Sequence, residues 1–176
     1  NAALLNRAGV KFAIAPGPGS VDAHQARLVL QLAGNAVANG LAWDAAIAAY
    51  PYLDASPTAS VVFIGSVASK VYVGSGVPYA MTKAAMDQMT RGLAVEWAEQ
   101  GITVNTVQPW YTQTDLAAPV LNDPARLAVI LAATPNKRIA APEDIAGIAM
   151  FLAGPAARHI TGTMIPVDGG FLAKGL

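Results

Sequence analysis

Tyr79 and Lys83 stand four positions apart in the segment GSGVPYAMTKAAMDQM, residues 74–89. Where the chain is helical, this spacing places both side chains on one face. An ammonium beside a phenol lowers the phenol's pKa and makes the group usable as a proton donor or acceptor. The pair therefore indicates acid–base chemistry, although a Tyr–Lys pair taken alone is more typical of an ordinary amphipathic helix.

A third polar residue, Ser66, directly follows the apolar run VVFIG at 61–65. Such a run is typical of a strand that is covered on both faces in a parallel sheet. Ligands of open α/β folds bind at the carboxyl edge of the sheet, where Ser66 would lie. Because the helix that begins at Tyr79 approaches the same edge, we expect Ser66, Tyr79 and Lys83 to converge.

Strand and helix patterns alternate along the chain without a hairpin signal. The predicted strands cover residues 11–15, 61–65, 102–108 and the segment MIPV. The predicted helices cover residues 20–40, 42–53 with an interruption near Pro51, 79–100, 124–134 after a cap at Asn122 or Asp123, and 141–154. This order predicts one α/β domain over residues 1–176, a truncated Rossmann-like three-layer parallel sheet of about four strands with helices on both faces.

Composition narrows the possible partners. Apolar residues make up 54% of the chain and charged residues 12%, whereas a typical domain has about a quarter charged residues. We therefore expect a homo-oligomer that buries apolar surface on the helix over residues 79–100. The 11 basic and 11 acidic residues cancel, which argues against nucleic acid and anionic membranes as partners and leaves a small-molecule substrate.

Location and metal content are also constrained. No apolar stretch reaches the roughly 20 residues of a membrane span, and the opening NAALLNRAGV lacks a signal-peptide layout, so we expect a cytoplasmic protein. The sequence has no cysteine and two histidines, and a zinc site usually needs three or four ligands. We therefore expect no metal.

From about Tyr50 to Gly170 the chain resembles the C-terminal half of a short-chain dehydrogenase/reductase, of the tropinone-reductase-like branch. The segments that carry this resemblance are VVFIGS, YAMTK, AMDQMTRGLAVEWAEQGITVNTVQPW, RIAAPEDIAGIAMFLAGPAARHITG and VDGG. Their order and spacing hold over some 120 residues, which makes the likeness far more specific than a lone Tyr–Lys spacing.

The resemblance implies roles for the candidate residues. Tyr79 would be the general acid/base, Lys83 would lower its pKa and hold the nicotinamide ribose, and Ser66 would orient the substrate carbonyl. The residues implied to lie along the nicotinamide are Pro109, Thr112 and Thr114. Those implied to line the substrate side are Trp110, Tyr111 and Leu116.

The same resemblance implies a first half that the sequence does not supply. A dinucleotide-binding fold has two mononucleotide halves and a Gly-rich turn that receives the pyrophosphate. Only 60 residues precede the VVFIG run, and no Gly-rich fingerprint occurs among them. The glycines of PGPGS (16–20) favour an ordinary strand–helix turn, because Asp22 would repel a phosphate there.

Residues 1–45 resemble a different family, the last strand and helices of an amidohydrolase barrel of the imidazolonepropionase type. We therefore expect a chimera, with an amidohydrolase-like segment over 1–45 and a short-chain-dehydrogenase-like half over 46–176. The junction would lie within residues 42–52. Both pieces follow the same alternation of strand and helix, so one could cover the sheet surface of the other.

Three functions remain open. The preferred interpretation is a cofactor-independent catalyst that hydrolyses activated esters, lactones or phosphoesters, with Tyr79 and Lys83 as nucleophile or base and Ser66 donating to the oxyanion. The alternative is an NAD(P)-dependent carbonyl reductase or alcohol dehydrogenase that binds its cofactor weakly. The second alternative is a folded oligomer without catalysis.

Overall fold

The computed structural model describes residues 11–13, 27–31 and 36–174. Its strands are β1 (Lys11–Ala13), β2 (Arg27–Gln31), β3 (Ser60–Ile64), β4 (Thr103–Pro109) and β5 (Met164–Val167). Its α-helices are α2 (Ala36–Asp54), α3 (Val77–Glu96), α4 (Ala118–Leu121), α5 (Pro124–Ala133) and α6 (Pro142–Leu152). Two 3₁₀ turns, η1 (Val67–Ser69) and η2 (Pro155–Ala157), complete the described elements. The predicted α/β class is confirmed.

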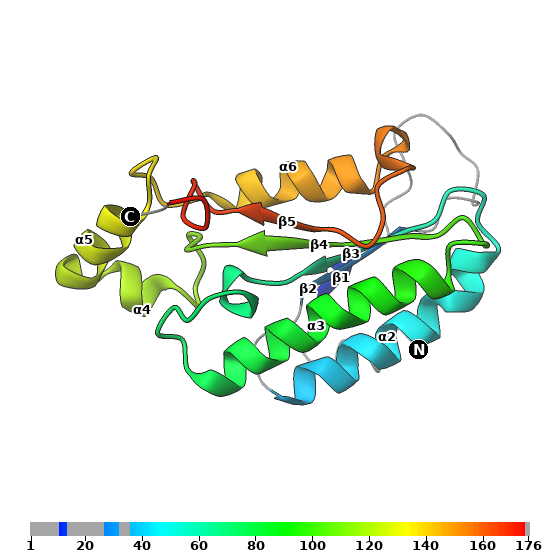
Figure 1. Ribbon diagram of the computed structural model, residues 1–176, viewed down its shortest axis with the longest axis horizontal. Coiled ribbons are helices and arrows are strands. Elements are labelled where there is room, and N and C mark those ends of the chain that lie inside the picture. Colours follow the sequence, from blue (N-terminus) through cyan, green and yellow to red (C-terminus); the bar gives the residue numbers. More distant parts are fainter. Residues whose placement is uncertain (1–10, 14–26, 32–35, 175–176) are drawn as a thin grey trace.

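The strands form one sheet in the order β1-β2-β3-β4-β5. Strands β2 to β5 are parallel, and β1 is antiparallel to β2. The sheet thus has one more strand than the four expected, namely β2, and the strand expected at 11–15 is present as β1 but runs antiparallel at the edge. Helices α2 and α3 cover one face and α6 covers the other, so the predicted three layers are present (Figure 1).

The segment RLVLQ at 27–31 corrects one prediction. It was expected inside a helix over residues 20–40, but it forms β2 and pairs with β3 from Arg27 opposite Ser60 to Gln31 opposite Ile64. A short apolar run does not distinguish strand from helix by its periodicity. The backbone groups along the edge of β3 need partners, and β2 supplies them.

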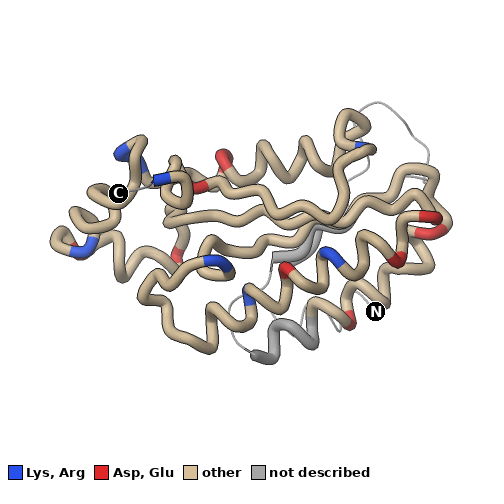
Figure 2. The backbone as a smooth tube through the Cα atoms, viewed as in Figure 1, with Lys and Arg blue, Asp and Glu red and all other residues tan. Residues whose placement is uncertain are grey.

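Strand β3 is buried on both faces, as its apolar run predicted. Val61 and Phe63 pack with α2 and α3, whereas Val62 packs with α6. This alternation follows from the two-residue period of a strand. Strands β3, β4 and β5 contain no charged residue, and the charged residues between positions 36 and 174 lie on helices and loops (Figure 2).

Helix α2 runs through Pro51 without the expected interruption. Pro51 is exposed and only three residues from the end of the helix, so the backbone hydrogen bond that it removes lies in the last turn. Ala42, Ala46 and Leu53 are buried in the core beneath it. Packing of this face therefore outweighs the local preference of proline to end a helix.

Helix α3 begins after Gly76, which has a φ of 89°, and carries Pro78 in its first turn. It buries Met86 and Leu93 against α2, with Trp97 just beyond its end. These residues belong to the core of the chain itself. Exposed apolar side chains remain at Val77, Met81 and Val95, and the homo-oligomer expected through this helix stays a prediction.

Within the described ranges, no helix combines the length and the apolar character that crossing a membrane would require.

Gly65, which directly follows β3, packs tightly against β4, and this packing gives a stability prediction. A Cβ on Gly65 would lie 2.6 Å from Thr106 Cγ2 and 3.4 Å from the Val107 carbonyl oxygen. We expect Gly65→Ala to lower the free energy of unfolding by about 1–3 kcal/mol, because both neighbours belong to a buried strand. Urea unfolding would measure the change.

Gly92→Ala is the matched control, since a Cβ there meets nothing within 4 Å in the middle of α3. Alanine should stabilise that helix by roughly 0.5–1 kcal/mol. Equal effects of the two substitutions would contradict the close approach at Gly65.

Candidate active site

Ser66 is fixed at the carboxyl end of β3. The preceding Gly65 donates its N–H to the Val107 carbonyl oxygen at 2.8 Å, which ties this end of β3 to β4. Ser66 then caps η1, and its Oγ accepts from the Ala68 N–H at 3.1 Å. A side-chain oxygen at this position satisfies one of the free donors of the turn. The hydroxyl is thereby held at the sheet edge that the sequence predicted.

Tyr79 and Lys83 reach this edge from the first turns of α3. The side chains of Tyr79 and Ser66 form a hydrogen bond. The Lys83 Nζ lies 5.7 Å from the centre of the Tyr79 ring and donates to the Ile64 carbonyl oxygen at 3.0 Å. Ile64 is the last residue of β3, so the same strand end contacts both groups. The expected convergence of the three side chains is therefore present in the structure.

Burial dominates the electrostatics of the pair. It raises the pKa of the Tyr79 phenol, the hydrogen bond from Ser66 opposes this, and nearby Tyr111 adds to it. The predicted lowering of this phenol's pKa is therefore wrong for this structure, because removal from water outweighs the hydrogen bond from Ser66.

Lys83 is only 4% exposed, and burial lowers its pKa from 10.5 to about 8. The carboxylate of Asp87, one turn further along α3, acts in the opposite direction and favours the charged form. The ammonium is thus buried, and its pKa of about 8 lies only slightly above neutral pH.

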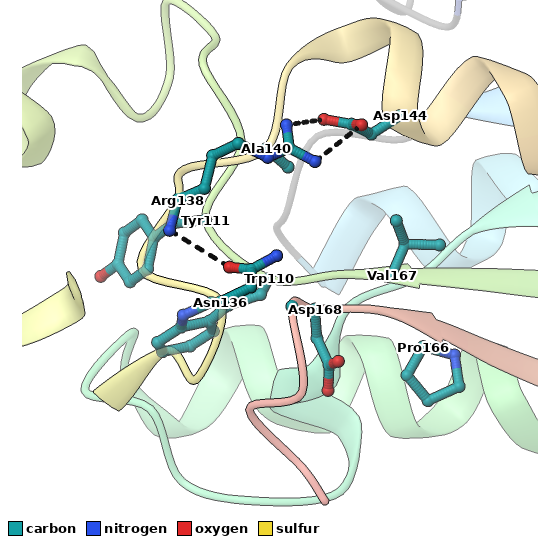
Figure 3. Close-up of a pocket in the computed structure, with 10 residues that line it drawn as sticks. Trp110, Tyr111, Asn136, Arg138, Ala140, Asp144, Pro166, Val167 and Asp168 are labelled. Carbon is teal, nitrogen blue, oxygen red and sulfur yellow. Dashed lines mark hydrogen bonds and ion pairs between the residues drawn. The ribbon is translucent and has the colours of Figure 1, made fainter. Parts of the chain in front are cut away.

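A cavity of about 330 Å³ lies at the carboxyl ends of β4 and β5 (Figure 3). The Trp110 indole forms one wall: it stacks on Phe171 at 3.9 Å between ring centres, and its Nε1 donates to Thr134 Oγ1 at 3.0 Å. The Tyr111 ring meets Trp110 edge-on at 4.7 Å. Tyr111 also acts on the pKa of Tyr79, but Ser66, Tyr79 and Lys83 do not themselves line the cavity.

The opposite wall is polar. Arg138 donates to both carboxylate oxygens of Asp144, at 2.6 and 3.0 Å. The hydrogen bond from Arg138, together with one from the Ala141 N–H, lowers the pKa of the Asp144 carboxyl to about 2. Asn136 and Asp168 also line the cavity.

Of the remaining predicted site residues, some line the cavity and others do not. Trp110 and Tyr111 line the cavity as expected, but Leu116 is 75% exposed and does not line it. Thr112 bridges to Ala140. Thr114 is exposed, and its Oγ1 accepts from the Ala117 N–H at 3.3 Å. Pro109 ends β4 half-buried beside Trp110.

Sequence reasoning missed Arg138, Asn136 and Asp168 as parts of the cavity. Two of them lie in segments that carried the family resemblance, RIAAPED and VDGG, but neither was given a chemical role. Their contribution depends on how the turns after α5 and β5 approach each other, which no local pattern encodes.

The described residues contain no group of three or more metal-ligating side chains. The turn PGPGS and Asp22, which the sequence analysis weighed for phosphate binding, lie outside the described residues.

Comparison with known proteins supports the family resemblance over most of the chain. A family model described as enoyl-(acyl carrier protein) reductase matches residues 6–172. The chain belongs to the short-chain dehydrogenase/reductase family. A tropinone reductase homologue from Arabidopsis thaliana is 43% identical over 127 residues, which is 72% of this chain and 48% of that protein. The chain thus spans about half the length of the curated relatives it matches.

Solved structures agree. A putative NAD(P)-dependent gluconate 5-dehydrogenase from Beutenbergia cavernae, with bound NADP, superposes with a TM-score of 0.76 at 33% identity, covering 83% of this chain and 66% of its own. The RhlG/NADP active-site complex from Pseudomonas aeruginosa gives 0.75 at 31%, covering 82% and 65%. These likenesses confirm the Rossmann-like fold.

The comparisons correct the expected chimera. The family match begins at residue 6 and runs through the proposed junction within 42–52, so nothing supports an amidohydrolase segment over 1–45. In that stretch the expected strand is present as β1, but part of the expected long helix is instead the strand β2, which is antiparallel to β1. The error arose because a strand–helix alternation is shared by many α/β families.

The hydrolase interpretation is also wrong, and the comparisons give no support to its premise of a cofactor-free site. The relatives named above are reductases and dehydrogenases, and two of the solved structures contain NADP. Hydrolysis was expected because no nucleotide-binding half was recognised, whereas the family match covers residues 6–172.

The buried ammonium predicts a pH-dependent stability. The pKa of Lys83 is 10.5 when unfolded and about 8 when folded, so between these values the unfolded chain binds more protons. The free energy of unfolding should therefore rise with pH across this window, by on the order of 3 kcal/mol when complete. Lys83→Met should remove this rise, as measured by urea unfolding at a series of pH values.

The exposed Lys70→Met is the control and should retain the rise. Parallel pH curves for wild type and Lys83→Met would contradict the assignment to Lys83.

Proposed function

We propose that this protein is an NAD(P)-dependent carbonyl reductase or alcohol dehydrogenase in which Tyr79 is the general acid/base. The observation that carries the proposal is the contact of the Tyr79 hydroxyl with Ser66 above an ammonium that is only 4% exposed. The match to a reductase family supports it. Acid–base work on a carbonyl needs a hydroxyl donor, a titratable group and a nearby positive charge, and this cluster has all three.

The raised pKa of Tyr79 suits the reducing direction. Because burial favours the neutral phenol, Tyr79 holds its proton at rest and can give it to the oxygen of a carbonyl that is gaining negative charge. Ser66 would orient that oxygen by donating its hydroxyl hydrogen. The Lys83 ammonium, 5.7 Å from the ring centre, would stabilise the phenolate that remains.

A nicotinamide cofactor, when bound, would supply or accept the hydride. The residues that would hold its nicotinamide end are Lys83, Pro109, Thr112 and Thr114. The donor set fits such a ring, because the Thr114 hydroxyl accepts from the Ala117 N–H and keeps its own hydrogen to donate. Pro109 offers a half-buried apolar surface beside it.

The cavity supports a small carbonyl compound as substrate. Trp110 and Tyr111 provide an aromatic wall, and Arg138 and Asp168 provide charge on the other side. A compound with an apolar ring or chain and one or two polar substituents would match both walls. The predicted substrate-side residues Trp110 and Tyr111 keep that role in the proposal, whereas exposed Leu116 would contact substrate only at the rim.

Tyr79→Phe tests this function. We expect wild type to oxidise NADPH or NADH in the presence of a panel of small cyclic and hydroxylated ketones, measured by loss of the reduced cofactor's absorbance. Phenylalanine keeps the ring but has no proton to give, so the rate should fall by roughly 100-fold or more. Cofactor binding, followed by fluorescence titration, should change little.

Tyr72→Phe is the matched control, because Tyr72 is 76% exposed and takes no part in the cluster. A Tyr79→Phe protein as active as wild type would overturn the assignment of Tyr79. A wild-type protein that binds neither NADPH nor NADH would overturn the proposed function.

A further inference from the structure

A second polar cluster lies directly beneath the Ser66–Tyr79–Lys83 cluster. Asp87 on α3 is 4% exposed and Gln108 on β4 is fully buried. The Gln108 Nε2 donates to Asp87 Oδ2 at 2.7 Å and to Ser69 Oγ at 2.8 Å. Ser69 in turn donates to the Ser66 carbonyl oxygen at 2.8 Å. The bonds therefore link a helix, a strand and the turn that holds Ser66.

The direction of these bonds defines what Asp87 Oδ2 does. The two amide hydrogens of Gln108 are used once each, and the single hydroxyl hydrogen of Ser69 is committed to Ser66. Asp87 Oδ2 is then an acceptor, and a proton on Oδ1 would have no acceptor among the described residues, because Oδ1 has no hydrogen-bond partner there. A buried carboxylate is costly unless a positive charge lies nearby.

Lys83 is the cation that meets this need. It lies one turn before Asp87 on the same helix, and residues at that spacing face the same side. Burial weakens the charged form of Lys83, and Asp87 counters this. Asp87 Oδ1 and Gln108 Oε1 have no hydrogen-bond partner among the described residues. Hydrogen bonding alone thus leaves the carboxylate incompletely satisfied.

We propose that Asp87, oriented by Gln108 and Ser69, is the buried counter-charge that keeps the Lys83 side chain an ammonium beneath Tyr79. Asp87 is therefore a positioning residue, because it acts through Lys83 and does not contact the reacting atoms. The importance of this ammonium for chemistry rests on the proposed function, but the charge coupling itself does not.

Other charged groups around α3 do not take this place. On α3 itself the titratable neighbours of Lys83 are Tyr79 and Asp87, and Tyr111 acts from the loop after β4. Arg91 lies one turn beyond Asp87, but it is exposed and donates to Gln88 Oε1 at 3.2 Å. Strand β4 and turn η1 contain no charged residue, and Lys70, which follows η1, is exposed. On α2, Tyr50 packs against Trp97 at the far end of α3, and the remaining titratable side chains described there are exposed, namely Asp44, Tyr52 and Asp54.

The test is to follow the Lys83 ε-methylene signal by NMR across a pH titration of the isotope-labelled protein. Wild type should titrate near pH 8. Asp87→Asn keeps the shape and removes the charge, so the midpoint should fall by about one to three units. Asp87→Glu, which restores the charge, should return the midpoint toward that of wild type.

Glu96→Gln is the control, since it removes an exposed carboxylate from the end of the same helix. Its midpoint should match wild type. An unchanged midpoint in Asp87→Asn, or an equal fall in Glu96→Gln, would overturn the proposal.

A measurement on wild type covers the case in which Asp87→Asn does not fold. The carboxyl carbon signal of Asp87 should move with the midpoint of Lys83, because each feels the charge of the other. A signal that stays flat through this pH range would overturn the proposal.

A measurement of carbonyl reduction against pH distinguishes this inference from the proposed function. If carbonyl reduction occurs, its alkaline limit should move to lower pH in Asp87→Asn by the same shift as the NMR midpoint. If the midpoint shifts but no variant and no wild type reduces a carbonyl, the counter-charge stands and the reductase proposal fails.

Discussion

The burial of one ammonium group, that of Lys83, is the constraint on which the site depends. Its Nζ is held by the carbonyl of the last residue of β3, while the Tyr79 ring lies above it. Removing a lysine from water is costly, and the structure accepts this cost at the point where strand and helix meet. Such placements concentrate at functional sites, because a perturbed charge is useful where protons are transferred.

The packed layers of the fold hold β3 and α3, the two elements that position Lys83. Strand β3 sends Val61 and Phe63 to one core and Val62 to the other, so its path is fixed from both faces. Helix α3 is fixed by Met86 and Leu93, which lie on the same helix as Lys83. A shift of either element would separate the Lys83 Nζ from the Ile64 carbonyl. The polar bonds from Asp87 to Gln108 and Ser69 add a further connection between helix, strand and turn.

The family relationship and the site point in the same direction. The chain spans about half the length of the curated relatives it matches, and that half contains Ser66, Tyr79 and Lys83 together with the aromatic wall at Trp110 and Tyr111. The proton-handling part of the proposed reaction therefore lies within the described residues. Tyr111, which lines the cavity, also influences the pKa of Tyr79.

Local sequence determined much of this arrangement. The apolar run 61–65 and the cap at Asp123 marked a strand and a helix close to where they occur, because each signal arises within one turn or strand. The four-residue spacing of Tyr79 and Lys83, with Ser66 after a buried strand, was enough to predict their convergence. Their family resemblance was visible in the same segments.

Only the tertiary structure decided the rest. RLVLQ became a strand because β3 offered it hydrogen bonds, and Pro51 stayed within α2 because the buried face of that helix packs against the core. The direction of the Tyr79 pKa shift depended on how much water the fold removes, which spacing alone does not encode. The hydrogen bond between Asp87 and Gln108, and the cavity that Arg138 and Asp168 both line, bring together residues far apart in the chain. Local patterns specify what a segment prefers, but burial and long-range contacts determine the charge that each site residue carries.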